Sequence, residues 1–373
     1  MRKLILFVAC LLCLCFLLPS GFVSAEETSK ASLLMEYDSG EVLQARNELD
    51  RRPIASMVKI MSLLLTFENL QSGKLSLEDT TTVSSHAAGM GGSQVFLDAG
   101  KTYRVESLIE GVVVASANDA CVALAEMQAG SEENFVRRMN ERAHELGCEN
   151  TAFTNCTGLP REGQYSCASD VARMLRALLH HPEYYRFANI WMDDFQHPSG
   201  RITQISNTNK LIRFYDGCDG GKTGYTSEAM HCVAATAKRG NLRFISVVVG
   251  ACGSKERFEE AKAMFNYGFA NYESEICLST EPFEAAVSGA KEDTAKVFAL
   301  HPLCVVKQKG ETVNVSVKTL LYDLRAPLKK GEVVGKAMLL KDGEQVAETA
   351  LVALEEVSAI TYPQQLKKIL QAR

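Results

Sequence analysis

The stretch MHCVAATAKRGNLRFISVVVG, residues 230–250, decides the fold. Its two halves, 230–237 and 242–250, are short runs rich in Val, Ala and Ile, as expected for strands that are buried on both faces. Lys238-Arg239-Gly240-Asn241 separates the halves and has the composition of a turn. The segment therefore predicts an antiparallel hairpin.

A second hairpin is predicted near the N-terminus, where 31–46 holds two strand-like runs around the turn Asp38-Ser39-Gly40. Strands return near residue 222, so early and late strands can join one antiparallel sheet. Helical spacing of apolar residues fills the sequence between the two hairpins and resumes after the second one. The expected helices are 54–70, 106–128, 132–146, 168–180 and 257–271. Residues 26–276 thus predict an α+β domain, an antiparallel sheet flanked by helices.

The composition changes after residue 276. Residues 277–357 alternate short strand-like runs with Gly-centred turns, which predicts a small all-β domain. In the remaining tail, 358–373, the apolar residues Leu366, Ile369 and Leu370 stand at helical spacing among basic residues. This tail is either an amphipathic helix that makes peripheral contact with a membrane surface or a frayed end.

The N-terminus has the layout of a secretory signal peptide. Arg2 and Lys3 precede an apolar run, and Val23-Ser24-Ala25 supplies small residues for cleavage after Ala25. The alternative is a membrane anchor that is never cut, but the run is shorter than the ~20 residues of a spanning helix. Residues 1–25 are therefore expected to direct export, which places the mature protein at the outer face of the cytoplasmic membrane, in the cell wall or in the periplasm.

Charge and cysteine content exclude further classes. The formal net charge of −5 becomes −7 when Arg2 and Lys3 leave with the signal peptide, and an acidic chain argues against a nucleic-acid partner. Nine of the 12 cysteines remain, without a metal-binding or redox CxxC pair. They are expected to be mostly buried small apolar residues with free thiols.

Three short motifs occur in order: Ser56-Met57-Val58-Lys59, Ser116-Ala117-Asn118 and Lys222-Thr223-Gly224. Each alone is a weak signal, since a serine can cap a helix and a lysine can simply lie in a turn. A second Ser-x-x-Lys, 288–291, falls in the β-rich part and is attributed to chance. The first motif stands at the start of an expected helix, so both of its polar side chains share one helix face.

These residue types suit nucleophilic catalysis. The hydroxyl of Ser56 needs a base, and a lysine with an ordinary pKa near ~10.4 is protonated at neutral pH. Burial and a second cation lower the pKa of a lysine, so Lys59 is the expected base and Lys222 the expected second cation. Ser116 would pass a proton to the leaving amine, and Asn118 would hold either Lys59 or the substrate amide.

The third motif is expected to begin an edge strand to which a substrate peptide adds by backbone hydrogen bonds. Lys222 and Thr223 would bind a terminal carboxylate, and Gly224 leaves room for the approach. None of these roles needs a metal or a cofactor, so the sequence predicts neither. His144-Glu145 and His180-His181 lack a second histidine at helical spacing and are expected to be surface or capping residues.

Together the motifs resemble those of penicillin-binding proteins and class A β-lactamases. The resemblance extends to D-alanyl-D-alanine carboxypeptidases of the low-molecular-mass penicillin-binding protein family. It is carried by Gly91-Gly92-Ser93-Gln94, by Phe153-Thr154-Asn155 with Thr157-Gly158-Leu159-Pro160, by 219–226 and, in the β domain, by 326–335. This chain departs from the family pattern at three positions. Ala117 stands where glycine is usual, Cys156 where proline is usual, and Gly221 where an apolar residue is usual.

The resemblance implies a serine-type enzyme that trims the terminal D-alanine from peptidoglycan pentapeptides ending in D-Ala-D-Ala. It implies that Ser56 is acylated by substrate and by β-lactam antibiotics. It also implies an oxyanion hole made by the backbone N–H groups of Ser56 and Tyr225, and a substrate carboxylate that Arg257 helps to hold. Arg257 could equally face solvent from its helix.

Three alternatives keep the same acylation site or the same fold. A class A β-lactamase needs a Glu-x-x-x-Asn segment between Asn118 and Lys222, which this sequence lacks, and has no extra β domain. A D,D-endopeptidase that cuts cross-links shares the whole site and stays open. A non-catalytic penicillin sensor needs a transmembrane signalling link, and no later stretch of the sequence is apolar enough to span a bilayer.

Overall fold

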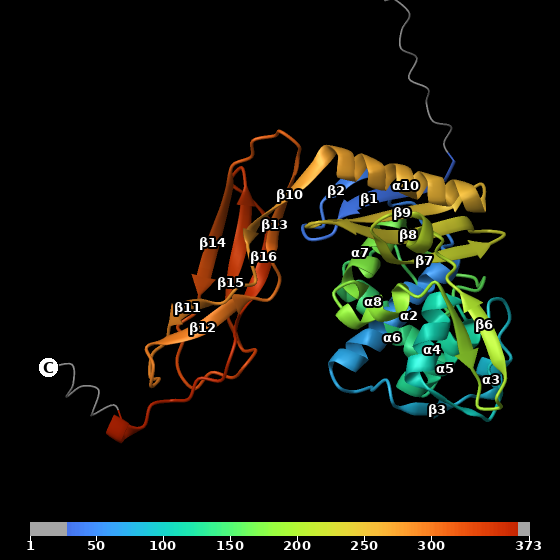
Figure 1. Cartoon of the computed structure of the whole chain (residues 1–373), viewed down its shortest axis with the longest axis horizontal. Helices are drawn as coiled ribbons and strands as arrows, with labels where there is room; N and C mark the ends of the chain where they lie inside the picture. The colour runs from blue at the N-terminus through green and yellow to red at the C-terminus, as the bar shows by residue number, and fades with distance from the viewer. Residues whose placement is uncertain (1–27, 365–373) are drawn as a thin grey trace, which may run out of the picture.

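The structure is a computed structural model that describes residues 28–364. The expected signal peptide, and the tail helix from residue 365 on, lie outside these residues. A helix-rich domain built around a five-stranded sheet is joined through the end of α10 to a separate body of strands (Figure 1). This arrangement confirms the predicted α+β domain followed by a small all-β domain.

The first domain is organised around a five-stranded antiparallel sheet in the order β2-β1-β9-β8-β7. The segment 230–250 forms the predicted hairpin at its centre, and the early hairpin pairs with it through β1 and β9, where Leu33 lies opposite Val247. β7 pairs only with β8 and is an edge of the sheet. The strands are β1 Ala31–Glu36, β2 Val42–Arg46, β7 Cys218–Thr226, β8 Met230–Arg239 and β9 Leu242–Ala251.

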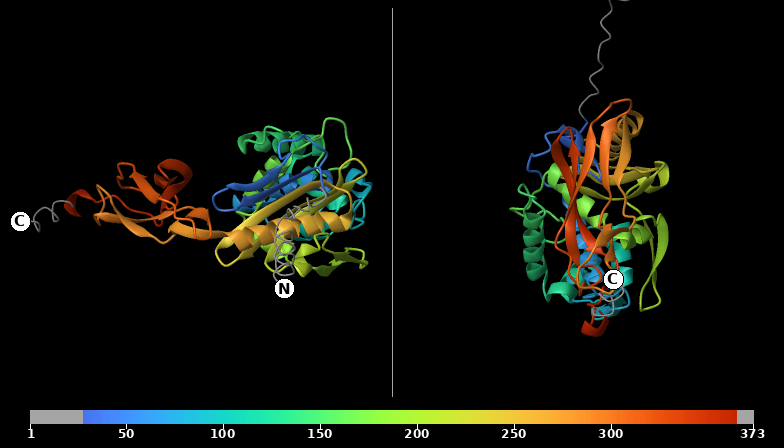
Figure 2. Two further views of the ribbon diagram at one scale, coloured as in Figure 1. Left: turned by 90° about the horizontal axis from the view of Figure 1, so that it is seen from above. Right: turned by 90° about the vertical axis from the view of Figure 1, so that its left-hand side faces the viewer.

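Helices cover both faces of this sheet (Figures 1 and 2). β9 is buried along its whole length, because alternate side chains enter two different cores. Ile245 and Val247 pack towards the helical layer that contains α2 and α7, and Phe244 and Val248 pack towards α10. The helices in contact with β9 are α10 Ser254–Asn271 and α7 Ala168–Leu178, and α2 Lys59–Gln71 packs on α7.

The helical layer differs from the prediction in one place that matters. The single helix expected over 106–128 is two helices, because the chain leaves the helical path at Ser116, which has φ 60°. The apolar spacing continues through both helices, so the pattern carried no sign of the break. The helices are α3 Ser85–Ala88, α4 Val105–Val114, α5 Asn118–Ala129, α6 Glu132–Glu145, α8 Pro182–Ala188 and α9 Leu211–Phe214.

Two small two-stranded sheets in the first domain had no counterpart in the prediction. Their strands carry mostly polar, exposed side chains, so no apolar alternation marks them. They consist of β3 Thr80–Thr82 with β4 Thr102–Arg104, and β5 Met192–Gln196 with β6 Ile202–Ser206.

The second domain contains two antiparallel sheets, β10-β13 and β11-β12-β16-β15-β14. Its first strand starts at Tyr272, directly after α10 and before the expected boundary at 277. Val297, Leu339 and Leu351 lie in its apolar core. The strands are β10 Tyr272–Leu278, β11 Phe283–Ala286, β12 Thr294–Ala299, β13 Leu303–Gln308, β14 Val315–Leu321, β15 Val333–Lys341 and β16 Glu344–Ala353.

The nine cysteines of the described chain are free thiols, and seven of them are buried, which agrees with their interpretation as small apolar residues. Within residues 28–364 no helix combines the length and the apolar character that a membrane crossing requires.

Candidate active site

Ser56 lies in a short 3-10 turn, Ala55–Val58, and α2 begins at Lys59. The turn is tight because Ala55 adopts φ 48°, a left-handed conformation that is uncommon for a residue with a Cβ. It places the Lys59 Nζ 3.1 Å from the Ser56 Oγ. The first motif therefore brings its hydroxyl and its amine into hydrogen-bond contact, with the lysine side chain fully buried.

Two oxygen atoms fix the other side of the Lys59 amine. The Nζ donates to the Asn118 Oδ1 and to the Thr157 carbonyl oxygen, both at 2.6 Å. Neither oxygen can donate a proton in return, so each takes one N–H of the lysine. A neutral amine has two N–H groups and one lone pair, and the lone pair is then left for the hydroxyl of Ser56.

Burial lowers the pKa of Lys59 from 10.5 to about 8, against smaller opposing effects from Cys121, Cys156 and Asp119. With that pKa, about a tenth of the molecules carry a neutral Lys59 at pH 7. An exposed lysine with a pKa near ~10.4 would be neutral in fewer than about one molecule in a thousand. The site thus makes a usable base out of a residue that is ordinarily an acid.

Asn118 is held in place from both sides. Its Nδ2 donates to the Gly91 carbonyl at 2.6 Å, and its backbone N–H donates to the Ser93 carbonyl at 2.7 Å. A Cβ on Gly92 would lie 2.8 Å from the same Nδ2, so this loop needs a glycine to reach the asparagine. Of the two roles that the sequence left open for Asn118, this geometry matches the one that holds Lys59.

Ser116 is buried in the connection between α4 and α5, two residues before Asn118. Its left-handed backbone has a cost of order 1 kcal/mol for a residue with a Cβ. Such conformations persist where the surrounding structure imposes them, and they are frequent at functional sites. The second motif is therefore a strained link between two helices and not part of one helix.

Lys222, Thr223 and Gly224 lie in the middle of β7, opposite Ala234, Val233 and Cys232 of β8. The motif was expected to begin an edge strand; the edge is confirmed, but the strand starts earlier, at Cys218.

Gly224 is needed by the protein itself. A Cβ there would lie 2.6 Å from the Ile54 carbonyl oxygen and 3.1 Å from the Ser56 nitrogen. The missing side chain lets the edge strand pack directly on the turn that carries Ser56.

Lys222 is buried, and its Nζ donates to the Thr223 carbonyl at 3.1 Å. Burial, then the charges of Lys59 and Arg257, lower the pKa of Lys222 well below its usual range. The sequence argument had Lys222 as the cation that lowers the pKa of Lys59. Burial is the largest cause at both amines, and the repulsion between the two positive charges, seen in the lowered pKa of Lys222, acts on both members of the pair.

Arg257 does not face solvent. It is buried at the start of α10, and its Nη1 donates to the carbonyl oxygens of Gly224 at 3.0 Å and Cys232 at 3.1 Å. It therefore ties β7 to β8 next to the third motif. Tyr225, the next residue along β7, is exposed, and its ring stacks on His231 with 4.4 Å between centroids.

Sequence reasoning missed several residues that shape this site. The Thr157 carbonyl is a backbone group with no side-chain signature, although its segment was one of those that carried the resemblance. Gly158 follows it with φ 86°, and a Cβ there would lie 2.0 Å from the Ala55 carbonyl oxygen. A glycine in a segment that carries a family resemblance can therefore indicate a position where two backbone segments pack closely, as Gly158 does here.

Gly221, a departure from the usual pattern, has a structural cause. It adopts φ 127°, and a Cβ would lie 2.2 Å from the Ala234 carbonyl oxygen. The hydroxyl of Tyr184 accepts from the Gly221 N–H at 3.0 Å and donates to the Gly221 carbonyl at 3.2 Å.

Across residues 28–364, no group of three or more His, Cys, Asp or Glu side chains is placed to hold a metal ion.

An α+β domain in which a half-buried serine contacts a buried lysine beneath a sheet edge defines a serine hydrolase of the penicillin-binding class. The family model described as D-alanyl-D-alanine carboxypeptidase matches residues 21–253, and that of the penicillin-binding protein 5 C-terminal domain matches residues 280–359. The chain belongs to the D-alanyl-D-alanine carboxypeptidase family, and it is a serine-type peptidase.

Similar proteins support this family assignment over nearly the whole chain. D-alanyl-D-alanine carboxypeptidase DacF of Bacillus subtilis (strain 168) is 40% identical over 346 residues, which cover 92% of this chain and 89% of the relative. D-alanyl-D-alanine carboxypeptidase DacC of Escherichia coli (strain K12) is 33% identical, covering 91% and 88%. The crystal structure of penicillin-binding protein 5 from Haemophilus influenzae matches with a TM-score of 0.69 and 33% identity, covering 89% of this chain and 98% of that chain.

Proposed function

We propose that this chain removes the terminal D-alanine from peptidoglycan peptides through an acyl-enzyme on Ser56, and that β-lactams acylate the same residue. The observation that carries the proposal is the Lys59 amine, 3.1 Å from the Ser56 Oγ, with two acceptors at 2.6 Å that take its N–H groups. A nucleophile in contact with a base that a third group orients is the general arrangement of covalent catalysis.

In the proposed acylation, neutral Lys59 accepts the hydroxyl proton while the Ser56 Oγ attacks the carbonyl carbon of the penultimate D-alanine. The backbone N–H groups of Ser56 and Tyr225 stabilise the resulting oxyanion. The C–N bond then breaks, Ser116 passes a proton to the nitrogen, and free D-alanine leaves. Water hydrolyses the ester and returns Ser56 to its starting state.

The proposed substrate adds to the free edge of β7, with its terminal carboxylate bound by Lys222 and Thr223. The site holds two buried amines whose pKa values are both lowered by burial. A bound carboxylate would favour the protonated form of Lys222 and so strengthen its own binding. Arg257 acts as a positioning residue, because it holds the carbonyl of Gly224 and with it the strand that receives the peptide.

We also propose that the protein acts outside the cytoplasm, after removal of residues 1–25. This rests on the signal-like sequence at the N-terminus. A mass for the exported protein that still includes residues 1–25 would contradict cleavage.

The decisive experiment incubates the mature protein with a pentapeptide ending in D-Ala-D-Ala and measures free D-alanine. Release is expected from the wild type and not from Ser56→Ala, which should also lose labelling by a fluorescent penicillin. Ser288→Ala, the serine of the second Ser-x-x-Lys, is the matched control and should behave as wild type. Persistent labelling of Ser56→Ala would refute the assignment, and a cross-linked peptide dimer as second substrate separates carboxypeptidase from endopeptidase activity.

A further inference from the structure

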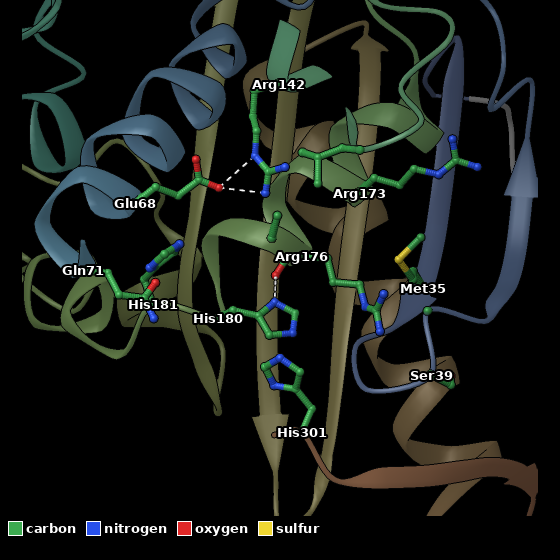
Figure 3. Close-up of a pocket in the computed structure, with 13 residues that line it drawn as sticks. Met35, Ser39, Glu68, Gln71, Arg142, Arg173, Arg176, His180, His181 and His301 are labelled. Carbon is green, nitrogen blue, oxygen red and sulfur yellow. Dashed lines mark hydrogen bonds and ion pairs between the residues drawn. The ribbon is translucent and has the colours of Figure 1, made fainter. Parts of the chain in front are cut away.

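A basic pocket lies where the two domains meet, away from the proposed active site. It has a volume of about 570 Å³ and is lined by the C-terminal parts of α2 and α6, by α7, by the β1–β2 turn and by His301 of the second domain (Figure 3). Glu68, on α2, lines it three turns beyond Ser56, which corresponds to roughly 18 Å along the helix. A second hollow of about 350 Å³, between Tyr37 and Glu348, continues from it along the domain junction.

The lining is rich in cationic groups. One carboxylate, Glu68, lines the pocket, and it is engaged by Arg142, whose Nε and Nη2 approach the same oxygen at 2.9 and 2.8 Å. Arg173 has its own partner outside the lining, Asp170, with 3.4 Å between the Nη1 and Oδ1 atoms, and its Nη1 also donates to the Gly147 carbonyl at 2.6 Å. The basic residues are Arg142, Arg173, Arg176, His180, His181 and His301.

Arg176 is a cation held in place by backbone carbonyl groups. Its Nε donates to the Tyr37 carbonyl at 2.5 Å and its Nη2 to the Asp38 carbonyl at 2.6 Å, so backbone oxygens hold the guanidinium without cancelling its charge. Its nearest opposing charge is Asp38, whose pKa is raised by burial and lowered in part by the charge of Arg176. Gly40 lies over the remaining nitrogen, where a Cβ would come within 3.1 Å of Nη1, so the absence of a side chain there leaves this nitrogen accessible.

Two histidines complete the pocket, one from each domain. The Nδ1 of His180 donates to the Arg176 carbonyl at 2.8 Å, which leaves Nε2 facing the ring of His301, with 4.9 Å between the centroids (Figure 3). Burial lowers the pKa of His180 to about 4, and burial together with Arg176 also lowers the pKa of His301. Both rings are therefore neutral in the empty pocket at neutral pH.

We propose that this junction pocket binds a phosphate-class oxyanion between Arg173, Arg176 and the His180–His301 pair. Guanidinium groups recognise phosphate through several N–H donors at once, and two guanidiniums on one side of a pocket suit an oxyanion with several acceptor oxygens better than a carboxylate with two. Because His301 belongs to the second domain, an anion held here also fastens that domain to the first. This site is independent of the proposed acylation chemistry.

Calorimetric titration of the mature protein with inorganic phosphate, against chloride at equal ionic strength, tests the proposal. We expect saturable binding at one site, weaker binding of acetate, and a loss of about tenfold or more in affinity for Arg176→Gln. Arg325→Gln is the matched control, because Arg325 is an exposed arginine of the second domain paired with Asp323, and it should bind as wild type. Absent or unsaturable phosphate binding, or equal binding by Arg176→Gln, would overturn the proposal.

Two further variants separate binding from folding, since Arg176 also holds the β1–β2 turn. Arg173, whose side chain is 45% exposed, and His301 can be changed to Gln with little effect on packing. Each should weaken phosphate binding while penicillin labelling at Ser56 stays at the wild-type level. Full phosphate affinity in both variants would contradict the site.

The two histidines should make the anion affinity of the pocket depend on pH. Sulfate is the suitable probe, because its own charge does not change between pH 8 and pH 6. The groups facing His180 are Arg176 from α7, Tyr37 from the β1–β2 turn, His181 beside it and His301 from the second domain. A bound anion favours the protonated rings, so sulfate affinity should rise as the pH falls, and less so in His301→Gln. An affinity independent of pH in the wild type would exclude the histidines from the site.

Three sources could supply the phosphate group that this pocket binds: free inorganic phosphate, the phosphodiester polymers of a cell wall, and lipid headgroups. Vesicles of phosphatidylglycerol, compared with vesicles of phosphatidylcholine, distinguish these sources. Cosedimentation with the anionic vesicles that Arg176→Gln abolishes identifies a headgroup. Binding of inorganic phosphate without cosedimentation identifies a soluble or polymeric phosphate.

Discussion

The two domains differ in what they bury. In the first domain, buried residues include Lys59, Asn118, Asp119, Lys222 and Arg257, all at or next to the proposed site. In the described part of the second domain, Thr349 is the one buried polar residue, and the core is otherwise apolar. A buried charge costs free energy unless it is paired, so its presence marks the domain in which the chemistry takes place.

Lys59→Met gives the largest expected contrast between the domains. Removing the proposed base should lower the rate of penicillin acylation by a factor of about 10² to 10⁴, while the protein still folds. The matched change in the second domain is Lys336→Met, which removes an exposed lysine paired with Glu348 at 2.8 Å. It should leave acylation unchanged, and stopped-flow acylation rates compare the two; equal rates for both variants would remove Lys59 from the mechanism.

Gly224→Ala tests the close approach of the edge strand to Ser56. A Cβ 2.6 Å from the Ile54 carbonyl must displace β7 or the turn, and a shift of that size in a catalytic geometry lowers the rate by about 10²-fold. Gly331→Ala is its counterpart in the second domain, where a Cβ meets open space and the cost is the left-handed φ of 79° alone. That variant should lose about 1 kcal/mol of stability with an unchanged acylation rate. The same kinetic measurement, with thermal unfolding, checks both.

The pH profile sharpens the contrast in charge. Since the neutral form of Lys59 is the base and its pKa is about 8, acylation should rise about tenfold per pH unit below pH 8 and level off above it. The lowered pKa also affects stability. Between about pH 8 and 10.5 the unfolded chain binds more protons at this lysine, so its contribution to the free energy of unfolding rises with pH.

The pH profile is measured as kcat/KM for a chromogenic β-lactam. The Lys59→Met variant should lose the rise in rate that levels off near pH 8. An unchanged rise in that variant would assign the titration to another group.

Leu351→Ala should have the smallest effect on the chemistry. Leu351 is fully buried in the core of the second domain, so its truncation should cost about 2–5 kcal/mol of stability. Acylation at Ser56 should not change at temperatures where the protein stays folded. Denaturant unfolding and penicillin labelling measure the two quantities, and a loss of labelling without unfolding would show that the domains are more tightly coupled than the comparison implies.

Much of the fold was predictable because its signals are local. The hairpin over 230–250, the early hairpin and the all-β second domain each follow from residue types within a few positions of one another. The break at Ser116 was not predictable from spacing, since apolar residues continue on both sides of it. The two-stranded sheets β3–β4 and β5–β6 were missed for the opposite reason, because most of their side chains are polar and exposed and no strand buries more than one residue.

At the candidate site the sequence supplied the side chains but not their environment. The three motifs identify Ser56, Lys59 and Lys222, because a nucleophile, a base and a cation can each be recognised from residue type and spacing. The carbonyl of Thr157 and the close packing of Gly224 on the Ser56 turn are backbone features, and neither has a side chain to read.

By itself, therefore, the sequence determined the elements, the domain types and the reacting groups, since all three depend on local composition and spacing. The tertiary structure alone decided that Lys59 is fully buried between α5 and the 155–158 loop, that Lys222 is buried close enough to feel its charge, and that His180 meets His301 across the domain junction. These facts depend on desolvation and proximity, and both are set by chain segments that lie far apart in the sequence.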